Sequence, residues 1–285
     1  MNEQEKLYGY VFTTCDMLET CRLGGVERVL DDSPIAVVSR IGADDPPRTK
    51  TQRFEGGFIR IVEAGKAGQV VWIFTGGRRT GYCFNMTLTL QRKVVRIPLS
   101  GFDQGFSDVS YSIGARKLTD SLLGEAKRLF TGIADCVDAF YGRSGFASMY
   151  VQRNEFMKKS GPLLGARLFP DFNRELPDVY WLNYFGPGYV EHWGKDKVDT
   201  LGAEYELCWS AKGGVCVVTT PRPISADPDV MGITDYPFKK HFYHILGGNT
   251  FVHETQKPGQ AGQYVPTLED HRRALPGQSR KPNES

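Results

Sequence analysis

Residues 177–194 read PDVYWLNYFGPGYVEHWG and predict a strand, a break and a short helix. Bulky side chains occupy both pleat faces from Val179 to Phe185, which is typical of a central strand that is covered on both sides. Gly186 breaks this strand, and Pro187 suits the first turn of a helix, where its missing N–H is not needed. Tyr189, Val190 and Trp193 share one apolar face of this helix, and Gly194 is positioned to end it. We therefore expect the rest of the domain to pack on this segment.

The chain after this segment predicts a hairpin, a helix and a tail. Apolar and polar side chains alternate from Glu204 to Ala211, and Val215–Thr220 returns after a turn at residues 212–214. Phe238–Leu246 is typical of a short helix that ends at two glycines. The composition then becomes polar and rich in Gly, Pro, Gln and Arg, so we expect residues 254–285 to form a disordered tail.

The chain before this segment contains the longest predicted helix. Between Leu118 and Tyr141, apolar residues recur at helical spacing and form one apolar stripe, which requires a sheet to cover. Thr119 or Asp120 is positioned to cap the start of this helix, and Gly142 to end it. Ala147–Gln152 then resembles a returning strand.

Short alternating runs predict an antiparallel meander from residue 58 onward. The clearest run is Tyr82–Leu90, in which every second residue is bulky and apolar. The other predicted strands are Phe58–Val62, Val70–Phe74, Lys93–Leu99 and Val109–Ile113. Residues 1–57 give weaker signals, and we expect a poorly defined N-terminal segment with one or two short elements.

The expected fold class is α+β, because the strands cluster by hairpin and do not alternate with helices. We expect a mostly antiparallel sheet with one long and several short helices packed on it. The domain would span residues 58–253. Its two halves are candidates for distant structural repeats, although no sequence self-similarity links them.

Composition excludes several classes of protein. The 285 residues are 40% hydrophobic and 24% charged, and the net charge of +2 gives no general attraction to nucleic acid or to anionic membranes. No apolar run approaches the roughly 20 residues of a membrane span. Residues 1–6 are unlike a signal peptide, so we expect a cytoplasmic protein. The six cysteines predict reduced thiols, although Cys208 and Cys216 could pair if oxidised.

Motifs for catalysis or cofactor binding are missing from the sequence. His241 and His244 share one helical face and, with His253, form the best candidate for a metal site, but no acidic residue in that helix has ligand spacing. The glycine pairs lack the dinucleotide and phosphate-loop patterns, and no Gly-x-Ser-x-Gly elbow occurs. We therefore predict no catalysis, no cofactor and no metal.

An acidic segment is the strongest sign of a binding function. Residues 171–206 contain eight acids and three bases in a chain whose net charge is positive. An exposed acidic face beside aromatic residues suits a basic protein partner, while a solvated surface around a hydrophobic centre is the alternative. The predicted contact residues are Asp178, Glu191, His192, Asp196, Asp199, Glu204 and Glu206. If Trp181 and Trp193 are both core residues, the interface lies instead on the hairpin or loops.

The aromatic segment resembles the central part of bacterial immunity proteins. The resemblance rests on a Trp-x-Asn-x-x-Gly-x-x-Tyr pattern at residues 181–189, and it extends over residues 82–246. Such proteins protect cells that deploy polymorphic or type VI secreted toxins, and one family accompanies toxins with a restriction-endonuclease-like nuclease fold. The resemblance implies an α+β protein that neutralises one cognate toxin without catalysis. Because a nuclease attracts phosphate with basic residues, an acidic face could cover its active surface.

Two functions of other classes stay open. One is an enzyme with an unfamiliar site near His241 and His244. Stoichiometric metal in the purified protein would favour this function. The other is a structural or regulatory module of a secretion system that binds a different partner through the same aromatic region. A toxin gene immediately upstream would favour the immunity function.

Overall fold

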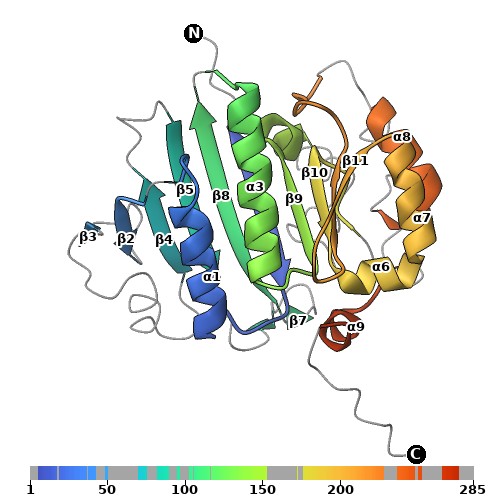
Figure 1. The fold of residues 1–285 in the computed structure, drawn as a ribbon, viewed down its shortest axis with the longest axis horizontal. Coiled ribbons are helices and arrows are strands. Elements are labelled where there is room, and N and C mark those ends of the chain that lie inside the picture. The colour runs from blue at the N-terminus through green and yellow to red at the C-terminus, as the bar shows by residue number, and fades with distance from the viewer. Residues whose placement is uncertain are drawn as a thin grey trace, which may run out of the picture.

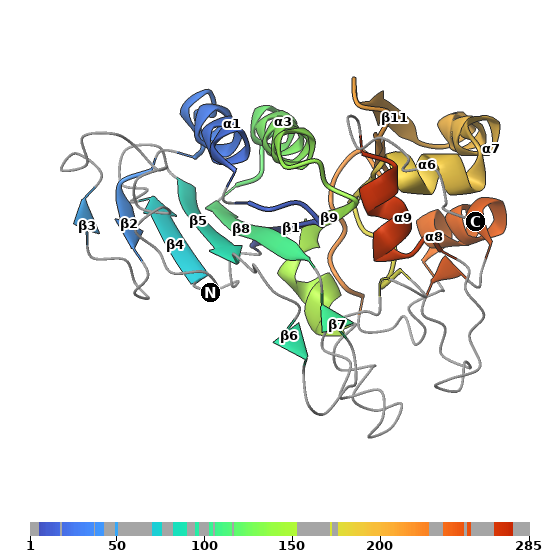
Figure 2. The same cartoon turned by 90° about the horizontal axis from the view of Figure 1, so that it is seen from below.

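The chain forms one ten-stranded sheet with helices on both faces (Figures 1 and 2). The computed structural model describes residues 6–17, 19–36, 38–42, 49–50, 70–75, 82–89, 95–96, 103–104, 106–115, 117–152, 172, 176–227, 236–247, 250–251 and 265–275. The sheet runs in the order β11 (Glu206–Trp209), β12 (Val215–Val218), β10 (Leu182–Phe185), β9 (Tyr141–Phe146), β1 (Leu7–Thr13), β8 (Ser107–Ala115), β5 (Tyr82–Thr89), β4 (Val70–Thr75), β2 (Arg40–Gly42) and β3 (Thr49–Lys50). Neighbouring strands are antiparallel throughout, so the expected α+β class with an antiparallel sheet is confirmed.

The remaining elements are short apart from two helices. A separate two-stranded sheet pairs β6 (Val95–Arg96) with β7 (Asp103–Gln104). The helices are α1 (Thr20–Asp31), α3 (Asp120–Cys136), α6 (Pro187–Trp193), α7 (Lys195–Asp199), α8 (Pro237–Leu246) and α9 (Leu268–Arg273), with a 3-10 turn, η2 (Thr200–Ala203). Within the described residues, no helix is both long enough and apolar enough to span a membrane.

Three predicted strands of the meander are confirmed as β4, β5 and β8. In β5 the predicted alternation holds, because Phe84, Met86 and Leu88 are buried while Cys83 is exposed. The predicted strand Lys93–Leu99 is reduced to the two residues of β6, and Phe58–Val62 lies outside the described residues.

The N-terminal strand β1 lies in the middle of the sheet, between β8 and β9. Leu7 and Val11 are buried on one face of this strand, and Phe12 is buried on the other. The expectation of a poorly defined N-terminal segment is therefore wrong for residues 7–31, which form β1 and α1. The sequence signal was weak because Tyr8, Gly9 and Tyr10 interrupt the apolar pattern of a central strand.

The helices α1 and α3 cover one face of the sheet (Figures 1 and 2). Thr119 caps α3 as predicted, because its side-chain oxygen accepts a hydrogen bond from the Leu122 amide at 3.2 Å. The helix ends at Cys136, earlier than predicted, because Asp138 adopts a left-handed conformation with φ of 50°. The chain then enters β9, which contains Gly142.

The opposite face of β9, β10 and β12 is covered by the C-terminal helices. An aromatic cluster joins side chains from both layers: Phe12, Tyr141, Phe185, Tyr189 and Phe242. Two predictions are wrong here. Residues 147–152 form a helical turn, where a strand was expected. Residues 265–275, expected to be disordered, contain α9, which begins with a reciprocal capping box between Thr267 and Asp270.

The strand β10 is shorter than the predicted strand Val179–Phe185 because of a side-chain hydrogen-bond pair. The amide side chain of Asn183 accepts from the Tyr180 N–H at 2.9 Å and donates to the Tyr180 carbonyl at 2.7 Å. Asn183 is fully buried, so these bonds replace ladder bonds that the chain would otherwise make at Tyr180. Residues 176–181 consequently run outside the named strands while staying buried.

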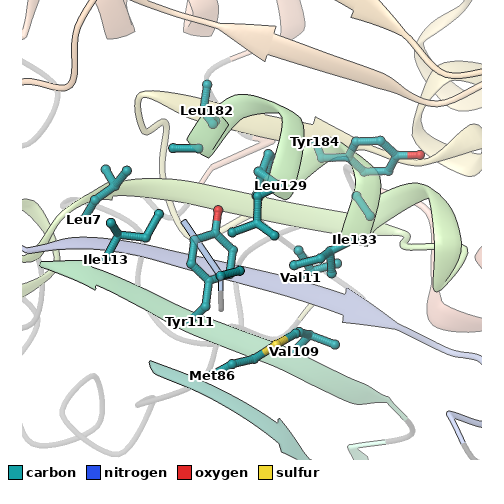
Figure 3. Packing of buried hydrophobic residues seen from close by; sticks show 14 of the residues in the cluster. Leu7, Val11, Met86, Val109, Tyr111, Ile113, Leu129, Ile133, Leu182 and Tyr184 are labelled. Atoms are coloured by element: carbon teal, nitrogen blue, oxygen red, sulfur yellow. The ribbon is translucent and has the colours of Figure 1, made fainter. Parts of the chain in front are cut away.

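The ring of Tyr111 lies over the glycine at the centre of β1. Figure 3 shows this ring among Leu7, Val11 and Leu129. An added Cβ at Gly9 would lie 2.2 Å from the ring carbon Cζ of Tyr111. Gly9 is therefore required by the close approach of the ring to the backbone of β1.

We expect Gly9→Ala to lower the free energy of unfolding by about 1–3 kcal/mol, the usual cost of overpacking a core. Urea denaturation measures this change. The matched control is Gly124→Ala in α3, where an added Cβ meets nothing within 4 Å. This control should gain about 0.5–1 kcal/mol from helix propensity. A midpoint for Gly9→Ala equal to that of the wild type would contradict the packing of Tyr111.

A buried histidine holds α9 against the body of the protein. The His271 ring centroid lies 4.4 Å from that of Tyr189 and 5.0 Å from that of Phe140. The pKa of His271 is lowered to about 3, chiefly by burial; Asp270 opposes this shift, and nearby His192 contributes to it. The folded protein therefore keeps this imidazole neutral at pH values where the unfolded chain protonates it.

We expect α9 to loosen as the pH falls below about 6.5, the ordinary histidine pKa. The docked state binds fewer protons than the undocked one, so acidification from pH 7 to pH 5 should cost about 2 kcal/mol of docking free energy. Hydrogen exchange of the amides of residues 268–273, corrected for intrinsic rates, measures this. His271→Leu, which cannot titrate, should abolish the dependence. Equal protection of the wild type at both pH values would refute the prediction.

Candidate partner-binding surface

A continuous outer segment runs from α6 through α7 and η2 into β11 (Figure 1). As predicted, Gly186 precedes α6, Pro187 occupies its first turn, and Gly194 ends it. The positive φ of Gly194, 83°, turns the chain directly into α7. These three residues make the segment follow the surface of the aromatic cluster.

The inward side chains of this segment anchor it to the core. Tyr189, Val198 and Leu201 are each fully buried in the aromatic cluster. The hydroxyl of Tyr205 donates a hydrogen bond of 2.6 Å to the Phe238 carbonyl in α8. Because one face of each turn is buried, the intervening polar residues are directed outward.

Six of the seven predicted contact residues are exposed along this outer segment, namely Glu191, His192, Asp196, Asp199, Glu204 and Glu206. We call them, with their backbone, the acidic surface. It carries five carboxylates and only two lysines from the same stretch, Lys195 and Lys197. Lys195 lies 2.6 Å from Asp199, and Lys127 of α3 lies 2.9 Å from Glu206. Five carboxylates against Lys195, Lys197 and Lys127 leave a net charge of −2 on this surface.

The seventh predicted contact residue, Asp178, is not on this surface. Its side chain is 2% exposed and forms an ion pair of 2.7 Å with Lys239, which is 0% exposed. The hydroxyl of Tyr243 donates a further hydrogen bond to the Asp178 carboxylate at 2.8 Å. Asp178 therefore ties residues 176–181 to α8, and its assignment to the interface is wrong. Sequence could not show this, because its partners lie more than 60 residues away.

Only one of the two tryptophans of the aromatic segment is a core residue, so the condition that would move the interface to the hairpin or loops is not met. Trp181 is buried and donates a hydrogen bond of 3.0 Å to the Thr220 carbonyl, and Trp193 packs half-buried against the aromatic cluster. An exposed tryptophan, Trp209, lies on β11, and the Lys195 ammonium lies 4.4 Å from its ring centroid. The predicted alternation placed Trp209 on the apolar face of this strand with Tyr205 and Leu207, so its exposure differs from the prediction.

A hollow of roughly 420 Å³ lies between α3 and the hairpin β11–β12. The Tyr184 hydroxyl lies 3.1 Å from an Asp135 carboxylate oxygen on its wall, and burial, reinforced by Asp135, raises the pKa of Tyr184. All six cysteines are free, including Cys208 and Cys216 on the same wall. Burial raises the pKa of both thiols, with Glu206 adding to the effect at Cys208, so neither is an activated nucleophile.

The two histidines of α8 differ in environment. His241 is half-buried, with its ring centroid 5.8 Å from that of Tyr205, and its Nε2 atom has no hydrogen-bond partner. His244 is exposed. His253 lies outside the described residues, within which no group of three or more His, Cys, Asp or Glu side chains is arranged to hold a metal ion.

The fold has a counterpart among solved structures. The solved structure of Pseudomonas aeruginosa T6SS protein PA0821 aligns over 95% of this chain and 81% of its own, with a TM-score of 0.57 and 13% sequence identity. The two proteins share a fold. No protein-family model matches this sequence, and no curated protein does. Because one fold serves many functions, partner and mechanism have to be argued from the surface of this chain.

We expect Asp178→Ala to lower the free energy of unfolding by about 3–5 kcal/mol, because it leaves the Lys239 ammonium buried without its carboxylate. The matched control is Asp199→Ala, which breaks the exposed pair with Lys195 and should cost less than about 1 kcal/mol. Chemical denaturation compares the two variants. Similar small losses in both would show that the buried pair adds no stability.

Proposed function

We propose that this protein is an immunity protein that binds a cognate toxin of a type VI or other polymorphic-toxin system and neutralises it in the producing cell. It acts by covering the active surface of a basic toxin, a nuclease being one candidate, and it performs no catalysis. The observation that carries the proposal is the acidic surface, whose carboxylates project from short elements anchored in the aromatic cluster. The fold shared with a T6SS protein supports the same setting.

The rigid scaffold beneath the acidic surface favours this function. Partners that associate through preorganised charges lose less entropy on binding, and a surface with an excess of one charge accelerates encounter with an oppositely charged partner. The acidic surface meets both conditions, since Tyr189, Val198 and Leu201 fix its backbone.

The residues of the immunity-like pattern form the scaffold beneath this surface. Trp181 and Tyr189 are buried, and Asn183 holds the bend at Tyr180. At Gly186 an added Cβ would lie 2.4 Å from the Ala139 carbonyl oxygen. The residues of the immunity-like pattern therefore account for the shape of this scaffold, while the outward carboxylates would select the toxin.

Charge reversal tests the proposal. We expect Asp196→Lys/Asp199→Lys/Glu204→Lys to abolish protection when the protein is co-expressed with the toxin encoded by the neighbouring gene. The association rate of the purified proteins at low ionic strength should fall at least about tenfold, because attraction becomes repulsion. Biolayer interferometry measures this rate.

The matched control is Asp31→Lys/Asp32→Lys/Asp120→Lys, which makes the same change in net charge at exposed sites at the end of α1 and the start of α3. This control should protect like the wild type. Full protection by the first variant, with unchanged binding, would exclude the acidic surface as the contact. Failure of the wild type itself to bind or protect would instead favour a structural or regulatory role in the secretion system.

A further inference from the structure

β11 is an edge strand, and its ladder with β12 determines which backbone groups face outward. The Ser210 N–H bonds to the Gly214 carbonyl at 2.8 Å, and Cys208 lies opposite Cys216. Hydrogen-bonded residues alternate along an antiparallel pair, so every second residue of β11 bonds to β12. The remaining two residues, Leu207 and Trp209, direct their N–H and C=O groups away from the sheet. Within the described part of the chain, these four groups have no hydrogen-bond partner.

The outward ladder of β11 is limited to these two residues. Before the strand, the Tyr205 N–H bonds to the Leu201 carbonyl at 2.9 Å. After it, Ser210 enters the turn of the hairpin. An incoming strand can therefore form four backbone hydrogen bonds, two at Leu207 and two at Trp209.

The edge of β11 is accessible and carries an exposed tryptophan. Figure 2 shows β11 between α3 and α7, at the outer margin of the molecule on the side of α1 and α3. Trp209 is 38% exposed, and the other large exposed hydrophobic residues of the described chain, Val151 and Ile224, lie outside the strands. Exposed tryptophans are typical of binding hot spots.

We propose that β11 pairs in an antiparallel manner with β11 of a second copy of this chain, around a two-fold axis at Cys208. Leu207 would lie opposite Trp209 of the second copy, and Trp209 opposite its Leu207, which satisfies all four outward groups on each strand. The two sheets then join into one continuous sheet across the dimer.

Side-chain pairing supports a second copy as the occupant. In this register an aliphatic side chain faces an aromatic one in both hydrogen-bonded pairs, which stabilises antiparallel strands. Glu206 falls opposite Ser210 of the second copy, so no like charges oppose each other. Charges of both signs flank this edge, namely those of Lys127, Lys195, Glu204 and Glu206. A strand of another protein that carries charges of one sign would therefore meet like charges as well as opposite ones.

Sedimentation equilibrium of the full chain tests the pairing. We expect a concentration-dependent dimer in the wild type. Leu207→Glu/Trp209→Glu places like charges opposite each other in both pairs and should weaken the dimer at least about tenfold. Leu207→Lys/Trp209→Glu changes the same two positions but places opposite charges in both pairs, so it should restore the dimer. Thermal melting establishes that both variants are folded.

Crosslinking tests the register independently. The Cα atoms of the two Cys208 residues would lie about 4.5 Å apart, within disulfide range. In a Cys21→Ser/Cys83→Ser background, which removes the other exposed thiols, copper phenanthroline with dissolved oxygen should oxidise the two Cys208 thiols to one intermolecular disulfide. Oxygen accepts the two electrons and two protons. Adding Cys208→Ser should abolish the linked dimer on a non-reducing gel.

A wild-type protein that stays monomeric at the highest soluble concentration would overturn the proposal. A dimer that Leu207→Glu/Trp209→Glu leaves intact, or one that forms no disulfide through Cys208, would overturn it as well. Because the proposal involves no toxin, its failure leaves the acidic surface and its co-expression test unaffected.

Discussion

Hydrogen bonding of β1 to both β8 and β9 is the constraint on which the rest of the structure depends. Without this strand, β8 and β9 have no common partner and the sheet divides in two. Leu7 and Val11 contribute to the core beneath α1 and α3, whereas Phe12 belongs to the aromatic cluster on the other face. Both layers of the molecule therefore meet at one N-terminal strand, whose contacts with β8 and β9 span most of the first half of the chain.

The aromatic cluster anchors α6, α7 and η2 to this sheet. Phe185 and Tyr189 fix α6 on the sheet, and the turns that follow are short enough that each buried residue is flanked by exposed ones. The apolar side chains fix the backbone, whereas substitution of the exposed carboxylates between them costs the fold little. If the proposed function holds, surface substitution would change the partner while the core stays constant.

The acidic surface ends at the edge strand β11, and the two features have different physical roles. Charged side chains act over a Debye length and direct encounter, whereas backbone groups at an edge bind only in register. The four residues of β11, with the charge of Glu206, are also typical of protected edges, which limit open-ended strand pairing. Two-fold pairing through Leu207 and Trp209 would use the whole outward ladder of β11, so no further strand could add at this edge.

Local sequence determined the elements whose side chains repeat regularly: the alternation of β5, the apolar stripe and Thr119 cap of α3, and the Gly186–Gly194 frame of α6. It also indicated which stretch would carry excess negative charge. Tertiary structure alone decided the position of β1, the docking of α9 and the burial of Asp178, since each depends on partners distant in the chain. A carboxylate next to a proline looks the same in sequence whether water or Lys239 neutralises it. Periodicity reports which way a side chain points, but only the assembled core fixes what it meets there.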